Sequence, residues 1–145
     1  VPDDESAVPL SQVATRIIGA TTTLSAPFAL HSQPVVEGSI PVQAADAVYS
    51  AAVQAMVNSL QHAGTSDSIE RWLSVNGTGN GGLEVQVGDT GVGFDPEDVQ
   101  VGRLGLRVSI LERVTNAGGA VRIDSSPGSG TLITICWPAR DEVSA

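Results

Sequence analysis

Apolar residues recur at helical spacing in three stretches of the chain, residues 10–20, 42–63 and 104–117. In the second stretch, Val48, Ala52 and Met56 follow one another at four-residue intervals, so they line one face of a helix. Gly64 comes just after this stretch and Gly118-Gly119 comes after the third, as expected where helices stop. The pattern therefore predicts three helices, of which the middle one is the longest.

Alternation of apolar and polar residues predicts strands between these helices. Leu83, Val85 and Val87 alternate with polar residues, which indicates a strand with one buried face at 83–87. Further extended stretches occur at residues 28–36, 69–75, 120–126 and 131–137, and Pro127–Gly130 has the composition of a hairpin loop. This order of elements favours an α+β fold, a two-layer α/β sandwich whose mixed, mostly antiparallel sheet is covered on one face by helices.

The length and composition are typical of one globular domain. The 145 residues can bury a proper core, and 41% of them are hydrophobic against 16% charged. We assign residues 10–138 to this domain. Residues 1–9 hold three adjacent acids and two prolines, so we expect a flexible tail or linker there and a C-terminal tail at 139–145.

The charged residues, cysteines and histidines exclude several classes of function. The net charge is −9. All seven basic residues are arginine, so the chain lacks the lysine of a P-loop or of a Schiff-base enzyme. The acidic balance argues against nucleic-acid binding, which rests on many basic contacts to phosphates. One cysteine and two separated histidines do not form a zinc site. No apolar run reaches about 20 residues, and no basic-then-apolar signal peptide opens the chain. The single cysteine fits a reducing cytosol, so a cytoplasmic location is expected for the domain.

Three polar residues on the longest predicted helix form the first candidate site. Gln54, Asn58 and His62 are spaced by four, so they lie one above another beside the apolar stripe. Asparagine is a mediocre helix former because its side chain competes for backbone hydrogen bonds. The ladder could point amides and an imidazole into a cleft. The alternative is a solvated helix face, which the pattern alone favours.

Two glycine-containing segments are the other candidates. In Gly88–Phe94, Asp89 could accept hydrogen bonds from an exocyclic amine, while the alternative is a tight turn with an Asx-type cap. Val101–Leu106 leads into the third helix, whose free N–H groups would suit a phosphate. Arg103 is best placed to add positive charge there, whereas Arg107 and Arg113 could instead pair with surface carboxylates.

Taken in order, these segments resemble the ATP-binding (HATPase) domain of the GHKL superfamily of gyrase, Hsp90, histidine kinases and MutL. Residues 53–63 are similar to its N box, residues 89–94 to its G1 box and residues 102–106 to its G2 box. The stretch 126–131 is similar to its final hairpin. The resemblance covers roughly residues 10–138, is closest for sensor histidine kinases, and implies the Bergerat ATP-binding fold.

The resemblance implies a site for ATP and Mg²⁺, with catalytic roles for three residues of the helix. Asn58 would hold the metal through its side-chain oxygen, and His62 would lie by the phosphates or the lid. The family has glutamate where this chain has Gln54, and a neutral amide cannot accept a proton or offer a charged ligand. We therefore expect nucleotide binding with slowed phosphoryl transfer.

The nucleotide itself would contact residues of the two glycine-containing segments and of the hairpin. Asp89 would accept the adenine amine, and Thr131 would support it through water. Gly105 and Leu106 would supply backbone N–H groups to the phosphates. The remaining residues that the resemblance assigns to nucleotide binding are Gly91, Gly93, Phe94, Gly102, Arg103 and Leu104.

The function implied is that of the catalytic and ATP-binding domain of a two-component sensor histidine kinase. It would donate the γ-phosphoryl group to a histidine on a dimerisation domain expected upstream of Val1, because His31 is interpreted as structural. The isolated chain is then not expected to phosphorylate itself. The short stretch from Phe94 to Gly105 is similar to a compact-lid subgroup that acts with LuxR-type response regulators.

Two alternatives and several features of the parent protein stay open. One alternative is an anti-sigma-factor-type serine kinase or binding module, and the other is a degenerate nucleotide-binding module, which only Gln54 supports. The expected partners are the dimerisation domain and, indirectly, the regulator, in a homodimeric parent without nucleic acid. A membrane anchor in the rest of the protein is left open.

Overall fold

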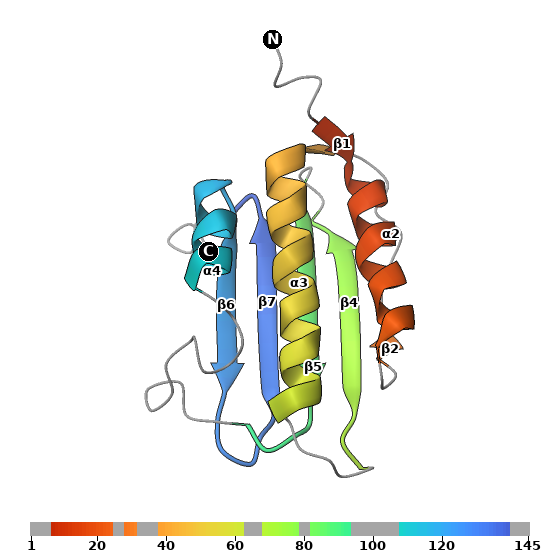
Figure 1. Ribbon diagram of the computed structural model, residues 1–145, viewed down its shortest axis with the longest axis vertical. Coiled ribbons are helices and arrows are strands. Elements are labelled where there is room, and N and C mark those ends of the chain that lie inside the picture. The colour runs from red at the N-terminus through yellow and green to blue at the C-terminus, as the bar shows by residue number, and fades with distance from the viewer. Residues whose placement is uncertain are drawn as a thin grey trace.

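In the part of the chain that the computed structural model describes, three helices lie on one face of a five-stranded sheet (Figure 1). The structure describes residues 7–24, 28–31, 38–62, 68–78, 82–93 and 108–139. The helices are α2 (Leu10–Ala20), α3 (Val42–His62) and α4 (Val108–Asn116), with a short 3-10 turn η1 (Thr21–Thr23) after α2. Figure 1 shows α3 across the middle of the sheet, with α2 and α4 on either side of it.

The sheet has the order β2-β4-β5-β7-β6. Its strands are β2 (Ala29–Leu30), β4 (Arg71–Gly77), β5 (Leu83–Asp89), β6 (Ala120–Ser125) and β7 (Thr131–Trp137). Strand β2 runs parallel to β4, and every other pair is antiparallel. The predicted α+β class, with a mostly antiparallel sheet covered on one face, is therefore confirmed.

The core lies between the sheet and α3, the longest described helix. Alanine is the best helix former, and α3 carries mostly alanines on its buried side. Short side chains let the helix approach the strands closely, while Met56 supplies bulk. The sheet contributes every second residue of its central strands, namely Leu73, Val75, Leu83, Val85, Val87, Ile133 and Ile135, all buried.

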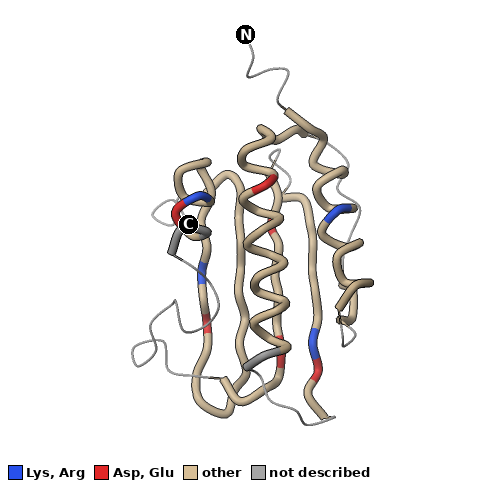
Figure 2. The backbone as a smooth tube through the Cα atoms, viewed as in Figure 1, with Lys and Arg blue, Asp and Glu red and all other residues tan. Residues whose placement is uncertain are grey.

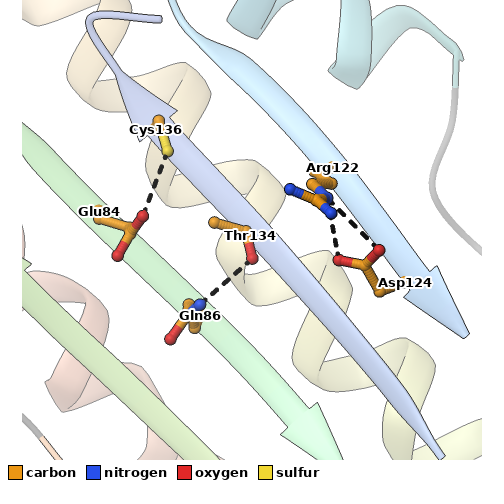
Figure 3. A network of polar contacts seen from close by, with 6 residues as sticks. All are labelled: Glu84, Gln86, Arg122, Asp124, Thr134 and Cys136. Carbon is orange, nitrogen blue, oxygen red and sulfur yellow. Dashed lines mark hydrogen bonds and ion pairs between the residues drawn. The ribbon is translucent and has the colours of Figure 1, made fainter. Parts of the chain in front are cut away.

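The opposite face of the sheet is polar. Figure 3 shows its side chains standing on the side of the strands away from the helices. The Cys136 thiol donates to Glu84 Oε2 at 3.6 Å, and Gln86 Nε2 donates to Thr134 Oγ1 at 3.4 Å. On the neighbouring β6, an exposed ion pair joins Arg122 and Asp124. The alternation of apolar and polar residues in 83–87 thus predicted correctly which face of the sheet each side chain occupies.

Several predicted boundaries need correction. Strand β4 begins at Arg71 rather than at residue 69, and β5 continues to Asp89, which is therefore the last strand residue rather than part of the loop. Residues 7–9 form β1 (Ala7–Pro9), antiparallel to β3 (Ser39–Pro41), so this part of the expected tail is paired strand. Residues 1–6, 32–37, 104–107 and 140–145 lie outside the described part of the chain.

Charged positions in the described residues are few and are spread over separate elements. Figure 2 shows arginines and acidic residues on both helices and strands rather than in one patch. None of the described helices, α3 included, is long and apolar enough to cross a membrane.

Candidate functional site

The predicted site elements meet at one end of the molecule. The C-terminal end of α3, the end of β5 and the β6–β7 hairpin lie together there (Figure 1). The strand register fixes the alignment, because Asp89 is paired with Thr131 and Thr131 is paired with Ser125. Asp89 is thereby placed beside the hairpin, and a hydrogen bond from Ser59 to Asp89 joins the end of α3 to β5 at this point.

Asp89 is a buried carboxylate held by two hydrogen bonds. The residue is only 6% exposed. The Ser59 hydroxyl donates to Oδ2 at 2.7 Å, and the Gly91 backbone N–H donates to Oδ1 at 2.9 Å. The Gly91 contact is the Asx-type turn that the sequence offered as an alternative. Each carboxylate oxygen can still accept another hydrogen bond, so the turn does not exclude a ligand.

Arg71 and Ser59 support this carboxylate, and sequence reasoning missed both. Arg71 Nε donates to Ser59 Oγ at 3.0 Å, and Arg71 Nη2 donates to the Ser59 carbonyl oxygen at 3.2 Å. In the register of β4 and β5, Arg71 is the direct partner of Asp89. A pair of opposite charges across two strands was the only signal, and it appears only once the register is known.

Asn58 is buried and carries an orphaned oxygen. The residue is 4% exposed, and its Oδ1 is buried without a hydrogen-bond partner among the described residues. A buried unpaired acceptor is costly unless something binds it. An amide oxygen is also the ligand type that Mg²⁺ prefers, since this ion takes oxygen ligands and keeps several waters. The residue therefore fits the metal that the resemblance implies.

The rest of the helix ladder is only partly described. Gln54, one turn before Asn58, is half-buried. His62 is the last residue of α3, and its side chain lies outside the described residues. For Asn58, burial rules out the interpretation of the ladder as a solvated helix face.

Two glycines bring the loop after β5 against the hairpin. Gly93 has a φ of +64°, and a Cβ there would lie 2.1 Å from the Ser126 carbonyl oxygen. Gly130 has a φ of +78°, and its Cβ would lie 2.1 Å from the Asp89 carbonyl oxygen. The Gly128 N–H also donates to the Val92 carbonyl at 2.7 Å. The backbones of the two segments are therefore in contact, which leaves no room for side chains at these positions.

Thr131 lies opposite Asp89 and beside the hairpin hydroxyls. Its Oγ1 is 3.0 Å from Ser125 Oγ, which donates to the Gly130 carbonyl at 2.8 Å. Because that bond uses the single proton of the Ser125 hydroxyl, Thr131 is the donor between the two hydroxyls. The Thr131 lone pairs then remain able to accept a hydrogen bond.

A hollow of about 410 Å³ reaches the same end of the sheet. Its lining includes Asp89 and Thr131, but also Trp72, Leu132 and Asp124, which alternate with core residues and so belong to the polar face. The Trp72 ring lies over Gly88, where a Cβ would be 2.3 Å from Cζ2. Trp72 is half-buried on the polar face.

The other predicted site residues cannot be placed. Phe94 and the segment of Gly102, Arg103, Leu104, Gly105 and Leu106 lie outside the described residues. Within the described part of the chain, no group of three His, Cys, Asp or Glu side chains could hold a metal ion. Among the described residues, the orphaned Asn58 Oδ1 is a candidate metal ligand.

Comparison with known proteins gives one family and a consistent set of relatives. The model of the histidine kinase-, DNA gyrase B- and HSP90-like ATPase family matches residues 43–141. A sensor-like histidine kinase of Chloroflexus aurantiacus is 35% identical over 97 residues, which are 63% of this chain and 16% of that protein. The chain thus spans about a sixth of the length of this relative.

Solved structures show the same fold. The histidine kinase domain of the Erythrobacter litoralis EL346 blue-light activated histidine kinase has a TM-score of 0.68 at 24% identity, over 90% of this chain and 65% of that one. The ATP binding domain of PrrB from Mycobacterium tuberculosis has a TM-score of 0.62 at 20% identity, over 93% of this chain and 97% of that one. At these identities the likeness concerns the fold.

Proposed function

The chain belongs to the histidine kinase-, DNA gyrase B- and HSP90-like ATPase family, and we propose that it is the catalytic and ATP-binding domain of a two-component sensor histidine kinase. One observation carries the proposal: a fixed, buried carboxylate at the end of β5 lies beside the helix turn that holds an orphaned amide oxygen. The first suits the amine of a base and the second suits a hard cation.

ATP would bind with its base at Asp89 and its phosphates toward α4. Asp89 would accept a hydrogen bond from the adenine 6-amino group. Thr131 would support the same edge of the base through a bridging water. Gly91 and Gly93 let the base and ribose approach the loop. The segment of Gly102, Arg103, Leu104, Gly105 and Leu106 leads to α4 and would supply N–H groups to the phosphates.

Asn58 is the residue that would hold Mg²⁺, and Gln54 and His62 lie on the same helix face one turn to either side. The bound ion would neutralise charge on the phosphate oxygens. In the transfer, an imidazole nitrogen of a partner domain attacks the γ-phosphorus, and the bond to the β,γ-bridging oxygen breaks. ADP leaves with the electron pair, and the imidazole loses its proton. The chain contributes positioning and electrostatic stabilisation.

The parent protein would be a homodimer in which the histidine comes from a dimerisation domain. A LuxR-type response regulator would then receive the phosphoryl group, in the compact-lid subgroup suggested by the short stretch between Phe94 and Gly105. These partners are proposed from the resemblance and from the sensor-like kinase relative.

Replacing Asn58 with leucine should abolish the effect of Mg²⁺ on ATP binding without harming the fold. ATP at ten times Kd is expected to add about 1.4 kcal/mol, which raises the Tm by a few degrees. The part of this shift that needs Mg²⁺ should disappear in Asn58→Leu. Because Oδ1 has no partner, its loss removes no hydrogen bond among the described residues, and the Tm without nucleotide reports what the substitution does to the fold.

The measurement is a thermal melt of the full chain with ATP, with and without Mg²⁺. A Mg²⁺-dependent shift that persists in Asn58→Leu would show that the metal ligand lies elsewhere. If the unaltered chain shows no shift at millimolar ATP, the kinase proposal fails and a degenerate partner-binding module becomes the better interpretation.

Replacing Gln54 with glutamate should speed phosphoryl transfer. A carboxylate at this half-buried position can accept a proton or bind a metal-bound water with full charge, whereas the amide cannot. A general base of this kind contributes typically about 100-fold or more. The test is single-turnover transfer from ATP in the parent protein with its histidine domain. An unchanged rate at unchanged ATP affinity would remove Gln54 as the cause of slow transfer.

A further inference from the structure

Arg71 reaches Asp89 through Ser59 rather than directly. The guanidinium donates from Nε to the Ser59 hydroxyl oxygen at 3.0 Å, and that hydroxyl donates to Asp89 Oδ2 at 2.7 Å. The Arg71 and Asp89 side chains do not form a direct ion pair, although the two described residues are paired across the strands. The three side chains are therefore linked in series by hydrogen bonds, with Ser59 between Arg71 and Asp89.

The second contact of Arg71 holds the helix end in place. Arg71 Nη2 donates to the Ser59 carbonyl oxygen at 3.2 Å. Ser59 is among the last four residues of α3, whose carbonyls have no partner within a helix. A cation at a helix C-terminus also interacts favourably with the helix dipole. Both contacts therefore fix Ser59 relative to the start of β4.

The direction of the Ser59 hydroxyl is the consequence that matters for the site. A serine within a helix has a competing choice, since its hydroxyl can donate back to the carbonyl four residues earlier. A hydroxyl has one proton and two lone pairs. When Arg71 occupies a lone pair and holds the serine carbonyl, the single proton is free to point at Asp89. The carboxylate is then kept in one orientation before a ligand arrives.

We propose that Arg71 is a positioning residue that acts through Ser59 to orient Asp89. The hydrogen bonds that link Arg71, Ser59 and Asp89 would then set the preference of the site for 6-aminopurine nucleotides. The proposal rests on the proposed function, because it assigns the adenine amine to Asp89. Preorganised groups bind more tightly, since less freedom is lost when the ligand arrives. A loosened carboxylate would lose the amine contact while the rest of the nucleotide still binds.

The test compares ATP with purine riboside triphosphate, which lacks only the 6-amino group. Dissociation constants are measured by titration calorimetry for the full chain, Ser59→Ala, Arg71→Gln and the double variant. Both single variants should bind ATP roughly three- to tenfold more weakly, the worth of one hydrogen bond. Their affinity for the purine analogue should change less than about twofold. The double variant should be no weaker than Ser59→Ala, because residues that act in series are not additive.

The controls separate this role from a purely structural one. Arg16→Gln removes an exposed arginine whose partner is Asp46, and it should leave both affinities unchanged. Melting curves without nucleotide report folding of each variant, and the small Ser59→Ala change keeps the test available if Arg71→Gln unfolds.

Two results would overturn the proposal, and a third would contradict the function on which it rests. Equal weakening of ATP and of the analogue would mean that Arg71 and Ser59 only support the fold. Additive losses in the double variant would mean that Arg71 does not act through Ser59. Failure of the unaltered chain to bind either nucleotide would instead contradict the proposed function itself.

Discussion

ATP affinity is expected to fall by roughly 100-fold when Asp89 is replaced by asparagine, while the fold survives. Asparagine has the same shape, but its amide NH₂ must stand where one carboxylate oxygen stood. Ser59 and Gly91 both donate to this side chain, and the adenine amine is a third donor. At least one donor then faces the NH₂ group, and the charge that strengthened the hydrogen bonds is lost.

The measurement is the dissociation constant for ATP by titration calorimetry, with melting curves to follow stability. Asp124→Asn is the matched control, because it removes a carboxylate of the neighbouring β6–β7 hairpin whose side chain is 49% exposed. We expect this control to bind ATP normally. Equal affinities for both variants and the unaltered chain would show that Asp89 does not contact the nucleotide.

The largest loss of stability is expected for Gly130→Ala, at roughly 3 kcal/mol or more. An L-residue with positive φ costs about 1–2 kcal/mol, and forcing an atom into a filled space costs about 1–3 kcal/mol further. Here the new Cβ would lie 2.1 Å from the Asp89 carbonyl oxygen. Since this is backbone rather than a flexible side chain, the hairpin or the end of β5 must move.

Gly128→Ala separates the two causes. Its φ of +80° is nearly that of Gly130, but a Cβ there would meet nothing within 4 Å. Gly128→Ala should therefore lower the unfolding free energy only by the cost of a positive φ, about 1–2 kcal/mol. Urea denaturation of both variants gives the comparison through the unfolding free energy. If the two variants lose the same stability, the contact between Gly130 and Asp89 does not constrain the hairpin.

The elements of the fold followed from local patterns wherever those patterns were long. The stripe through Val48, Ala52 and Met56 predicted α3, and the bounds of β7 agree with the prediction at both ends. Strands β1 and β3 were not predicted, because three residues bounded by proline carry no periodic signal. Their pairing depends on contacts between segments distant in the chain.

Part of the site could be predicted, and the rest depends on tertiary structure. Asn58 and Asp89 stood out through spacing and through the glycines that follow Asp89. Ser59 and Arg71 did not, because their contacts span 30 and 12 residues and arise only when α3 lies over the start of β4. The burial of Asn58 was equally hidden, since it follows from how the helix is rotated on the sheet.

The edges of the sheet bear on self-association. An exposed, long and apolar edge strand is a template on which another chain can add a strand, and this is a route to aggregation. One edge here is β2, with only two residues, and the other is β6, which carries Arg122 and Asp124 on its exposed face. Shortness at one edge and charge at the other disfavour growth of the described sheet by strand addition.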